Sequence, residues 1–503
     1  MRSHTTKIII RVQSANMVKP IEINNWQVGI ADSPHVGFAD MRNVDVWSEP
    51  GIVKVGLRTV QSSATIGKVR WFATNSDDPS MVFGLDEGNR LIRSTNTGAT
   101  WSTLSDQAGA GQGLAFWKKN VIVASNDGLI AFDGNFTSGT TLTPGIDPDG
   151  EYHPLLPAQD DILYGGAGRY VLSLQEVSGT VFTANSPGSY TLTARALDLP
   201  NGYRVKCLEE LGTDLAIGTF QGSTNITNGN YQIRVSDIFP WDRVSDSFGP
   251  PIRINETGAN QMLNSNNVLY INAGTQGNYY ITNGSSTEPL FSIPPQIADP
   301  DSSTFFINEP GGIAKYNDEV LFGTRGNTFG FGGQGVWTYK NGAKILKNTI
   351  SNAQDGSGTA NVEVIAIHNV GPTDYILSWA YGGVNYGIDK VSTTRYTDYQ
   401  ARIDSPYYRV GTPNQNETLK QLEFSLAEPL QTGQGIRFSH RTSLNGSFTQ
   451  TSPYTFDFAT NGAIQNGIAT LDAEVKDGIQ LRIEMTTASG TANTPKLQTV
   501  WIR

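Results

Sequence analysis

The stretch VIVASNDGLIAFDG, residues 121–134, decides the fold of this chain because its pattern recurs along the sequence. It consists of an apolar strand, a turn that contains glycine, and a second strand. Related stretches begin at Met81, Val121, Ile162, Leu215, Val268, Val320 and Tyr375. By subtraction, the spacings between these starts are 40, 41, 53, 53, 52 and 55 residues, close to the ~40 to 50 residues of a four-stranded propeller blade. The repeat therefore predicts an all-β protein with a seven-bladed β-propeller over residues 68–394.

Small residues follow the apolar ones in five of these copies, at Gly84, Ala124, Gly165, Gly218 and Gly323. We expect them on inner strands that crowd around a central channel, where side-chain volume is limiting. A set of stacked sandwiches stays open as the alternative, because alternating strands alone do not decide how sheets close.

The composition agrees with many short strands joined by tight turns: 54 of 503 residues are glycine and 16% are charged. The formal net charge of −10 disfavours a reader of nucleic-acid grooves. The single cysteine, Cys207, excludes an internal disulfide framework and a cysteine-based zinc site. No apolar run approaches the ~18 residues of a membrane span, and the N-terminal one is too short for a secretory signal. We therefore expect no membrane span and no export, with residues 1–20 as a flexible tail.

The segments on either side of the repeats have different patterns. Residues 395–503 contain alternating strands such as KQLEFSLAEPL (420–430) and IQLRIEMTTA (479–488), and they predict one antiparallel β-sandwich. Residues 21–67 form a docking or closing segment. Within it, Pro50 and Gly51 form a turn that leads into the strand IVKVGL, which either closes the ring or docks on a neighbour.

The stretch STNTGATW, residues 94–101, resembles the Asp-box of sialidases and related β-propellers, S-x-D-x-G-x-T-W, with Asn96 in the place of Asp. Ser94, Asn96 and Gly98 favour a compact turn, and Trp101 supplies an aromatic side chain to bury. The resemblance implies a folding element on the rim of a blade, remote from catalysis.

A second resemblance lies in residues 28–58, which are similar to the N-terminal segment of the propeller-containing nozzle or tail-tubular proteins of short-tailed bacteriophages. The matching residues are Ser33, Pro34, Met41, Asn43, Pro50, Gly51 and Arg58. The C-terminal strands resemble the C-terminal sandwich of phage virion proteins. Here the matching residues are Lys420, Leu422, Phe424, Gly433, Ile436, Phe438, Arg441 and residues 479–483.

These resemblances imply a non-enzymatic structural component of a tailed-phage virion, in the tail as a nozzle or distal tail protein, made in the host cytoplasm. Its expected partners are other virion proteins, namely the tail adaptor, tail fibres or capsid, and copies of itself in a homo-oligomeric ring. DNA would pass as cargo only, repelled by an acidic channel. Three alternatives stay open: capsid decoration, a host-glycan-binding propeller and a sialidase-like glycoside hydrolase. Glycan binding could also reside in the C-terminal sandwich.

The candidate chemistry is sparse, and we predict no catalytic, cofactor-binding or metal-binding residues. A sialidase-like enzyme needs converging arginines, a Tyr activated by a Glu, and a carboxylic acid. Arginines near strand starts are expected to form surface ion pairs: Arg70, Arg93, Arg169, Arg204, Arg234 and Arg325. The histidines are expected in turns or at the surface: His4, His35, His153, His368 and His440. The run DPDGE (147–151) is interpreted as a turn, with Ca²⁺ as the alternative, and TFGFGGQG (328–335) as a hairpin tip.

Overall fold

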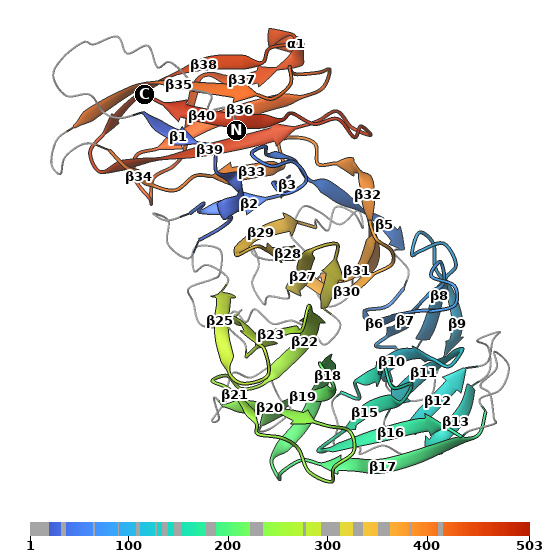
Figure 1. Ribbon diagram of the computed structural model, residues 1–503. Coiled ribbons are helices and arrows are strands. Elements are labelled where there is room, and N and C mark those ends of the chain that lie inside the picture. The colour runs from blue at the N-terminus through green and yellow to red at the C-terminus, as the bar shows by residue number, and fades with distance from the viewer. Residues whose placement is uncertain are drawn as a thin grey trace, which may run out of the picture.

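A computed structural model describes residues 20–31, 37–63, 66–88, 90–106, 111–125, 128–132, 139–144, 152–177, 188–221, 235–274, 278–292, 312–324, 335–350, 363–381, 385–410 and 416–503. Small antiparallel sheets follow one another around a ring, and the C-terminal strands lie on one side of it (Figure 1). The β-propeller predicted from the repeat is confirmed. No helix among the described residues has the length and apolarity needed to cross a membrane.

Six separate four-stranded sheets make up most of the ring. The first has β6 (Val69–Thr74), β7 (Val82–Asp86), β8 (Arg90–Ser94) and β9 (Ser102–Asp106). The second has β10 (Gly111–Trp117), β11 (Asn120–Ser125), β12 (Gly128–Phe132) and β13 (Gly139–Pro144). The third has β14 (Leu155–Pro157), β15 (Leu163–Ala167), β16 (Tyr170–Glu176) and β17 (Tyr190–Asp198). The fourth has β18 (Tyr203–Leu211), β19 (Asp214–Gln221), β20 (Ser236–Trp241) and β21 (Ile252–Ile254). The fifth has β22 (Ala259–Ser265), β23 (Val268–Ala273), β24 (Asn278–Thr282) and β25 (Thr287–Ser292). The last has β30 (Glu363–Asn369), β31 (Tyr375–Tyr381), β32 (Asn385–Arg395) and β5 (Leu57–Ser63).

The prediction of seven separate blades is corrected to six. The repeat that begins at Val320 forms four antiparallel strands, β26 (Ile313–Tyr316), β27 (Glu319–Thr324), β28 (Gly335–Lys340) and β29 (Ala343–Asn348). They are not an isolated sheet, because Arg42 of β2 (Asp40–Arg42) bridges in parallel to Leu346 of β29. This bridge makes the four strands part of a fourteen-stranded sheet that continues into the C-terminal region.

The ring closes with a strand from the N-terminal side of the repeats. β5 pairs antiparallel with β32, with Lys390 opposite Val60 and Ile388 opposite Ser63. The last sheet is therefore built from strands more than 300 residues apart, as the pair Val60 and Lys390 shows. The IVKVGL segment (52–57) contributes only Leu57, opposite Arg395, to this closure, because Val53 bridges to Leu497 and β4 (Lys54–Val55) pairs with β3 (Val44–Asp45).

The closed sheet β30–β31–β32–β5 packs against the first sheet, β6–β9, and we call this contact the closure seam. The Asp-box-like turn, between β8 and β9, lies in it. Ser94 Oγ accepts from the Gly98 amide at 2.9 Å, and Asn96 Oδ1 accepts from the Thr100 amide at 2.9 Å. Trp101 Nε1 donates to Ser62 Oγ of β5 at 3.2 Å. The predicted turn is confirmed, and its contacts join the two ends of the ring.

Other side chains also cross the closure seam. Thr74 Oγ1 of β6 and His368 Nε2 of β30 lie 2.6 Å apart. Lys390 Nζ donates to Thr97 Oγ1 at 2.7 Å. Buried Ile66, Val69, Ile92 and Ile388 form an apolar cluster between the same two sheets. Polar and apolar contacts together hold the ring shut.

The small residues of the repeat lie on the second strand of each sheet, whereas the first strands of neighbouring sheets contact one another around the ring. An ideal Cβ on Gly323 would lie 2.5 Å from Val364 Cγ1 of the next sheet. On Gly218 it would lie 2.4 Å from Cys207 Sγ. The physical reason for these small residues is close packing within and between sheets, rather than crowding at a central channel.

The C-terminal strands belong to the fourteen-stranded sheet, which runs in the order β1, β40, β35, β38, β37, β36, β39, β33, β2 before it reaches β29. Their bounds are β1 (Ile21–Ile23), β33 (Ala401–Asp404), β34 (Tyr408–Arg409), β35 (Glu417–Leu426), β36 (Gly435–Arg441), β37 (Thr449–Asp457), α1 (Phe458–Asn461), β38 (Asn466–Val475), β39 (Gly478–Thr486) and β40 (Leu497–Ile502). β37 and β38 are joined by the single pair Ser452 and Thr470. The strands therefore hydrogen-bond as one continuous sheet, and not as the two separate sheets of the expected sandwich.

The largest apolar core lies among these strands and reaches β26–β29. Phe424 of β35 contacts Phe438 of β36 and Phe456 of β37, with ring centroids 5.2 and 4.9 Å apart. Along β38, buried residues alternate with exposed ones, as expected for a strand with one face on a core.

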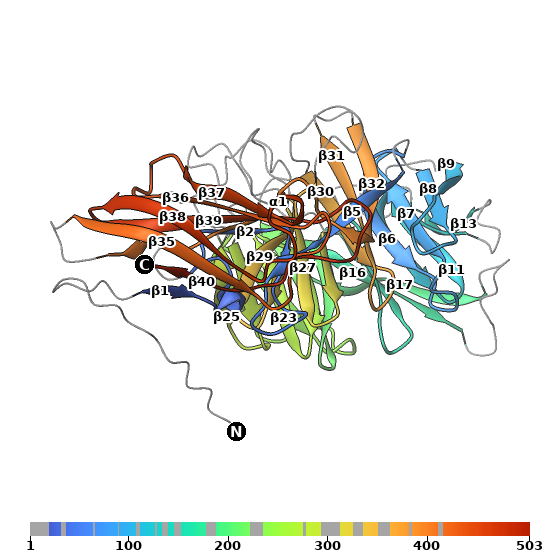
Figure 2. The same cartoon turned by 90° about the horizontal axis from the view of Figure 1, so that it is seen from above.

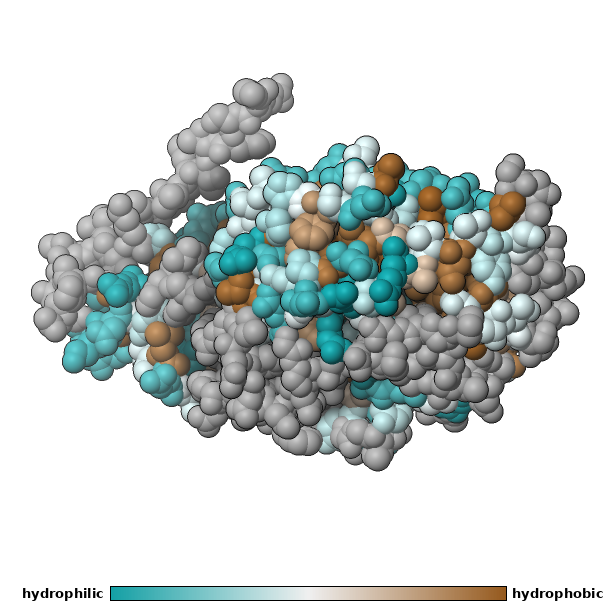
Figure 3. All heavy atoms as spheres, turned by 90° about the horizontal axis from the view of Figure 1, so that it is seen from below, coloured by the Kyte–Doolittle hydropathy of each residue, from teal (hydrophilic) through white to brown (hydrophobic). Residues whose placement is uncertain are grey.

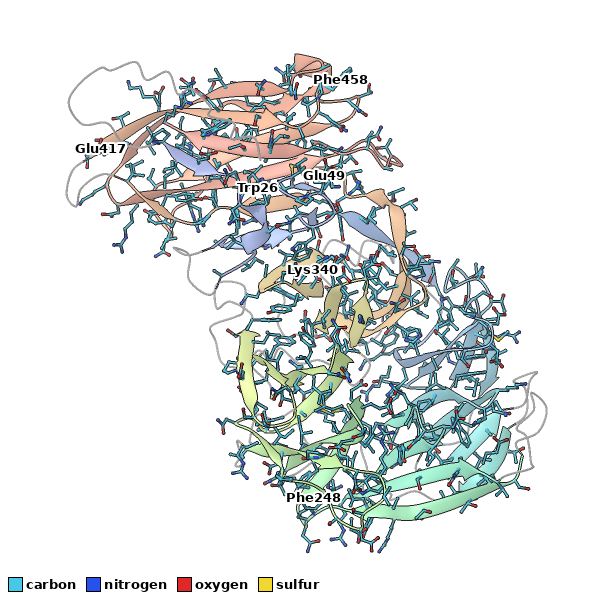
Figure 4. All side chains as sticks on the ribbon, in the orientation of Figure 1. Trp26, Glu49, Phe248, Lys340, Glu417 and Phe458 are labelled. Atoms are coloured by element: carbon cyan, nitrogen blue, oxygen red, sulfur yellow. The ribbon has the colours of Figure 1, made fainter. Side chains whose placement is uncertain are left out.

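The N-terminal segment lies between the C-terminal strands and β26–β29, and Figure 4 places Trp26 and Glu49 there. It contains β1, the 3-10 helix η1 (Trp26–Val28), β2, β3 (Val44–Asp45) and β4 (Lys54–Val55). Asn43 is buried with a left-handed φ of 57°. Its Nδ2 donates to Thr349 Oγ1 at 2.8 Å and to the Gln400 carbonyl at 3.0 Å. One side chain thus ties the segment to both flanking parts.

Candidate functional site

The four described arginines of those singled out above are spread over three sheets. Arg70 and Arg93 are on the first sheet, Arg204 is on the fourth, and Arg169 precedes β16 of the third. Arg70 pairs with Glu87 at 2.5 Å, and Arg169 lies 3.9 Å from Asp198, which agrees with the ion pairs expected for these two. Arg234 and Arg325 are outside the described residues.

Tyrosine and carboxylate side chains do pair, as a sialidase-like mechanism requires, but each pair lies on a separate sheet. Tyr280 Oη is 3.2 Å from Glu256 Oε1, and burial raises the pKa of Tyr280 to about 12. Tyr164 donates to Asp160 at 2.9 Å, and burial raises its pKa above the ordinary value too. A nucleophilic phenolate needs the opposite shift, so these hydroxyls act as hydrogen-bond donors.

The histidine prediction is wrong for the three described histidines. His153 and His440 are buried, and His368 lies in the closure seam on β30. His153 Nδ1 is 3.0 Å from the Gly166 carbonyl. They are structural residues because their rings pack inside the fold. His4, His35, the run 147–151 and most of the run 328–335 lie outside the described residues, and within the described part no group of three His, Cys, Asp or Glu could hold a metal ion.

The densest charged group lies on the outward face of β2, β33, β36 and β39. We call it the arginine cluster: Arg42, Arg402, Arg441 and Arg482 around Asp40 and Asp404. Strand register builds it, because Asp40 is opposite Asp404, Asp404 is opposite Arg482, and Arg42 is opposite Arg402. Between these charged residues, Met41, Ile403 and Ile483 point inward and are fully buried.

Asp404 is the centre of the arginine cluster. Its side chain is 6% exposed and accepts paired bonds from Arg482, at 2.8 and 2.9 Å, and from Arg402, at 3.1 and 2.5 Å. Burial alone would raise the pKa of Asp404, but the bonds from Arg482 and Arg402 outweigh it and hold the pKa below its ordinary value. Asp404 is therefore ionised at neutral pH.

Arg441 is the member of the arginine cluster with no carboxylate of its own. Its Nε donates to Gln480 Oε1 at 2.6 Å, and its guanidinium lies 4.8 Å from the Phe448 ring centre. Arg482 covers the same ring at 3.7 Å. Burial lowers the pKa of Arg441, and the charges of Arg482 and Arg402 act in the same direction, against Asp404. Such a guanidinium is suited to a carboxylate or another oxyanion.

The arginine cluster was not predicted from the sequence, although a signal is present. The triplets DMR (40–42), RID (402–404) and RIE (482–484) each place an apolar residue between two charged ones. In a strand this spacing puts both charges on one face and the apolar residue on the core. A nearby pocket of about 200 Å³, lined by Glu22, Asn24, Phe38, Pro406, Tyr408 and neighbours, lies where β1 meets the C-terminal strands.

Comparison with known proteins adds little to this geometry. No protein-family model matches the chain, and no curated protein matches it. The β-propeller domain of Cps50 (Swd1) from Myceliophteria thermophila is similar at 10% identity and a TM-score of 0.43, covering 66% of this chain and 100% of that one. The computationally designed protein Ika8 is similar at 13% identity and a TM-score of 0.38, covering 71% of this chain and 97% of that one. YCF48 is similar at 10% identity and a TM-score of 0.43, covering 67% and 96%. At these scores the likenesses carry no argument, and the propeller rests on the strand pairing above.

Proposed function

We propose that this protein is a non-enzymatic structural component of a tailed-phage virion, placed in the tail as a nozzle or distal tail protein. It acts there as an assembly scaffold and DNA conduit, in contact with the tail adaptor, tail fibres or capsid. The residues that carry the resemblance to phage nozzle proteins support this proposal, because each described one has an architectural role.

Asn43 carries the proposal. The hydrogen bonds of its side-chain amide join the N-terminal segment to Thr349, just beyond β29, and to Gln400, just before β33. Met41 is fully buried, and Arg58 Nε donates to Thr394 Oγ1 at 3.0 Å. Gly51 has a φ of +76° in the turn after Pro50. Proteins that share an architecture need to share the residues that hold its parts together, and the matching residues here do this. Proteins that share an activity would need to share a site instead.

The same proposal includes the finer architecture. We propose that β26–β29 fill the gap between the fifth and the last of the six blades, since Tyr279 of β24 contacts Phe322 of β27 at 4.6 Å and Leu321 shares an apolar cluster with Val364 and Ile367 of β30. The C-terminal strands are two layers of a sandwich, supported by the contact of Phe424 with Phe438. Residues 68–394 and 395–503 are then the two domains, and residues 21–67 join them and supply β5 to the last blade.

Immunogold labelling of the parent particles, with mass spectrometry of gradient-purified virions, tests the proposal. We expect the chain in purified particles and the label at the tail. Label spread over the head would replace the tail role with capsid decoration. Absence of the chain from particles would overturn the proposal, and a glycan array would then test the host-glycan-binding alternative.

A further inference from the structure

The C-terminal strands have two outward faces of opposite charge. One carries the arginine cluster, on β2, β33, β36 and β39. The other lies on β1, β35 and β38 and carries Glu22, Glu423, Asp472 and Glu474, which we call the carboxylate face. Both faces belong to the same chain, so each copy presents both.

The arginine cluster has more cations than anions. Arg437 and Glu484 lie on the same face, so five arginines stand against three carboxylates, and Arg42, Arg402 and Arg482 are the ones that pair with the two aspartates. Arg441 has no carboxylate within ion-pair distance among the described residues. An anion from outside would complete its pairing. The side chains of Arg42, Arg402 and Arg482 are 20 to 26% exposed, so their outer edges can be reached from solvent.

Neutral sugars do not suit this face. Sugar recognition without charge uses open aromatic faces, and here guanidinium groups cover the rings. Arg482 and Arg441 lie against Phe448, and Arg437 lies 3.6 Å from the ring centre of Tyr399. The free hydrogen-bonding capacity belongs to guanidinium donors, which favour carboxylates.

The carboxylate face supplies that chemistry. Strand register places Glu474 opposite Thr418 and Glu423 opposite Ile468. Asp472 and Glu474 are exposed and have no ion pair among the described residues, while Glu423 pairs with Arg503. Four carboxylates against Lys420 and Arg503 leave two negative charges, which equals the excess on the arginine cluster. The two faces are complementary in charge.

The carboxylate face also exposes an apolar residue. Ile468 of β38 is 59% exposed, the most exposed large hydrophobic side chain among the described residues of the C-terminal strands. Phe448 is half-buried among Arg441 and Arg482, and the part of its side chain that they leave exposed offers Ile468 an apolar contact. An apolar contact ringed by ion pairs is the usual composition of a specific interface.

We propose that the arginine cluster of one copy binds the carboxylate face of a second copy, with Ile468 of that copy packed against Phe448. The contact is heterologous, because each copy uses one face for each neighbour, and repeated contacts form either a ring or a filament. The inference rests on the proposed function only for the closed ring of a tail. The pairing of faces is a property of the purified chain.

Sedimentation velocity of the purified full chain tests the pairing over a concentration series, at about 0.05 M and about 0.5 M salt. We expect association that rises with concentration and weakens at high salt. Arg441→Glu and Glu474→Arg should each weaken self-association at least tenfold, and Ile468→Ser should weaken it too. Mixing Arg441→Glu with Glu474→Arg should restore association, because the reversed charges then meet.

The matched control is Lys118→Glu, which makes the same charge change on the propeller, where Lys118 pairs with Asp161 at 3.0 Å. It should associate as the wild type does. Circular dichroism and thermal midpoints identify any variant that fails to fold. Only variants that fold are used in the mixing experiment, which then decides whether the two faces pair. A wild type that stays monomeric at low salt, or an Arg441→Glu variant that associates normally, would overturn the pairing. Neither result depends on where the chain lies in a virion.

Discussion

Gly98 and Ile376 meet across the closure seam so closely that position 98 has no room for a side chain. An ideal Cβ on Gly98 would lie 2.4 Å from Cγ2 of Ile376. Gly98 belongs to the Asp-box-like turn of the first sheet, and Ile376 belongs to β31 of the last. The turn that suggests a sugar-cleaving scaffold is, in this fold, a contact that closes the ring.

We expect Gly98→Ala to destabilise the protein by about 2 to 4 kcal/mol, because it adds overpacking to an unfavourable left-handed backbone. Gly98 has a φ of +81°, whereas Gly342 has a φ of +84° with nothing within 4 Å of its ideal Cβ. Gly342→Ala therefore isolates the backbone cost, about 1 kcal/mol. Thermal midpoints of both variants measure the difference, and equal losses would show that the contact with Ile376 does not matter.

His368 should make stability depend on pH. Burial lowers its pKa from 6.5 to about 4 in the folded protein. At pH values between these two pKa values, His368 is protonated in the unfolded chain and neutral in the folded chain. The contribution of neutral His368 is fully present above pH 6.5 and is lost as the pH falls toward 4.

Between pH 7.5 and 5 this amounts to at most about 2 kcal/mol. Urea unfolding of the wild type and of His368→Gln, at both pH values, measures it. We expect a smaller drop for the variant, since glutamine does not titrate. Parallel drops in the two proteins would assign the pH dependence to other groups.

Asn43→Ala should cost about 3 to 4 kcal/mol, because it removes the side-chain hydrogen bonds that Asn43 donates to Thr349 Oγ1 and the Gln400 carbonyl, and the one that its Oδ1 accepts from the Thr349 amide at 2.8 Å. Asn267 is the matched control, since it has a similar φ of 61° on an exposed turn. Asn267→Ala should lose only the backbone preference of asparagine. Differential scanning calorimetry of the two variants tests this, and similar losses would contradict the joining role of Asn43.

Cys207 should resist thiol reagents in the native protein. Burial raises the pKa of its thiol to about 12, and its sulfur lies 3.7 Å from the Ala259 carbonyl oxygen. A thiol reagent needs both access to the sulfur and the thiolate form, and neither is available until the contact between β18 and β22 opens. Labelling with a chromogenic disulfide should be slow in buffer and rapid in denaturant. Rapid labelling in buffer would show that the fourth and fifth sheets separate readily.

Five of the six separate sheets could be predicted from the sequence because each is a local meander whose turns and apolar strands are contiguous, whereas the last one takes β5 from the other end of the repeats. The fusion of β26–β29 with the C-terminal region could not, since Arg42 and Leu346 are 304 residues apart by subtraction and make one parallel bridge. No local pattern encodes such a pair. The number of separate sheets was wrong for this reason, although the strands of that repeat lie where expected.

The arginine cluster shows the complementary difficulty. Each of its charged triplets is visible in the sequence, but their meeting depends on the order in which β2, β33, β39 and β36 pair. That order is set by distant chain segments.

The burial of the histidines could not be predicted either. The sequence shows no metal-ligand spacing among them, and this favoured turns or the surface, whereas His153 and His440 are buried. On the face shown in Figure 3, hydrophobic residues form small areas separated by hydrophilic ones, so surface hydropathy gives no further guide.

The pairing of both chain ends has a consequence for synthesis. Ile21 of β1 lies opposite Ile502 of β40, and β5 pairs with β32, which is synthesised much later. As the ribosome releases the chain, the middle sheets can form one after another, but β1 and β5 have no partner until their late strands emerge. Figure 2 shows β1 and β40 side by side at the edge of the finished molecule. A ribosome that stalls before β40 has emerged would leave a complete ring with β1 unpaired, an edge open to other chains.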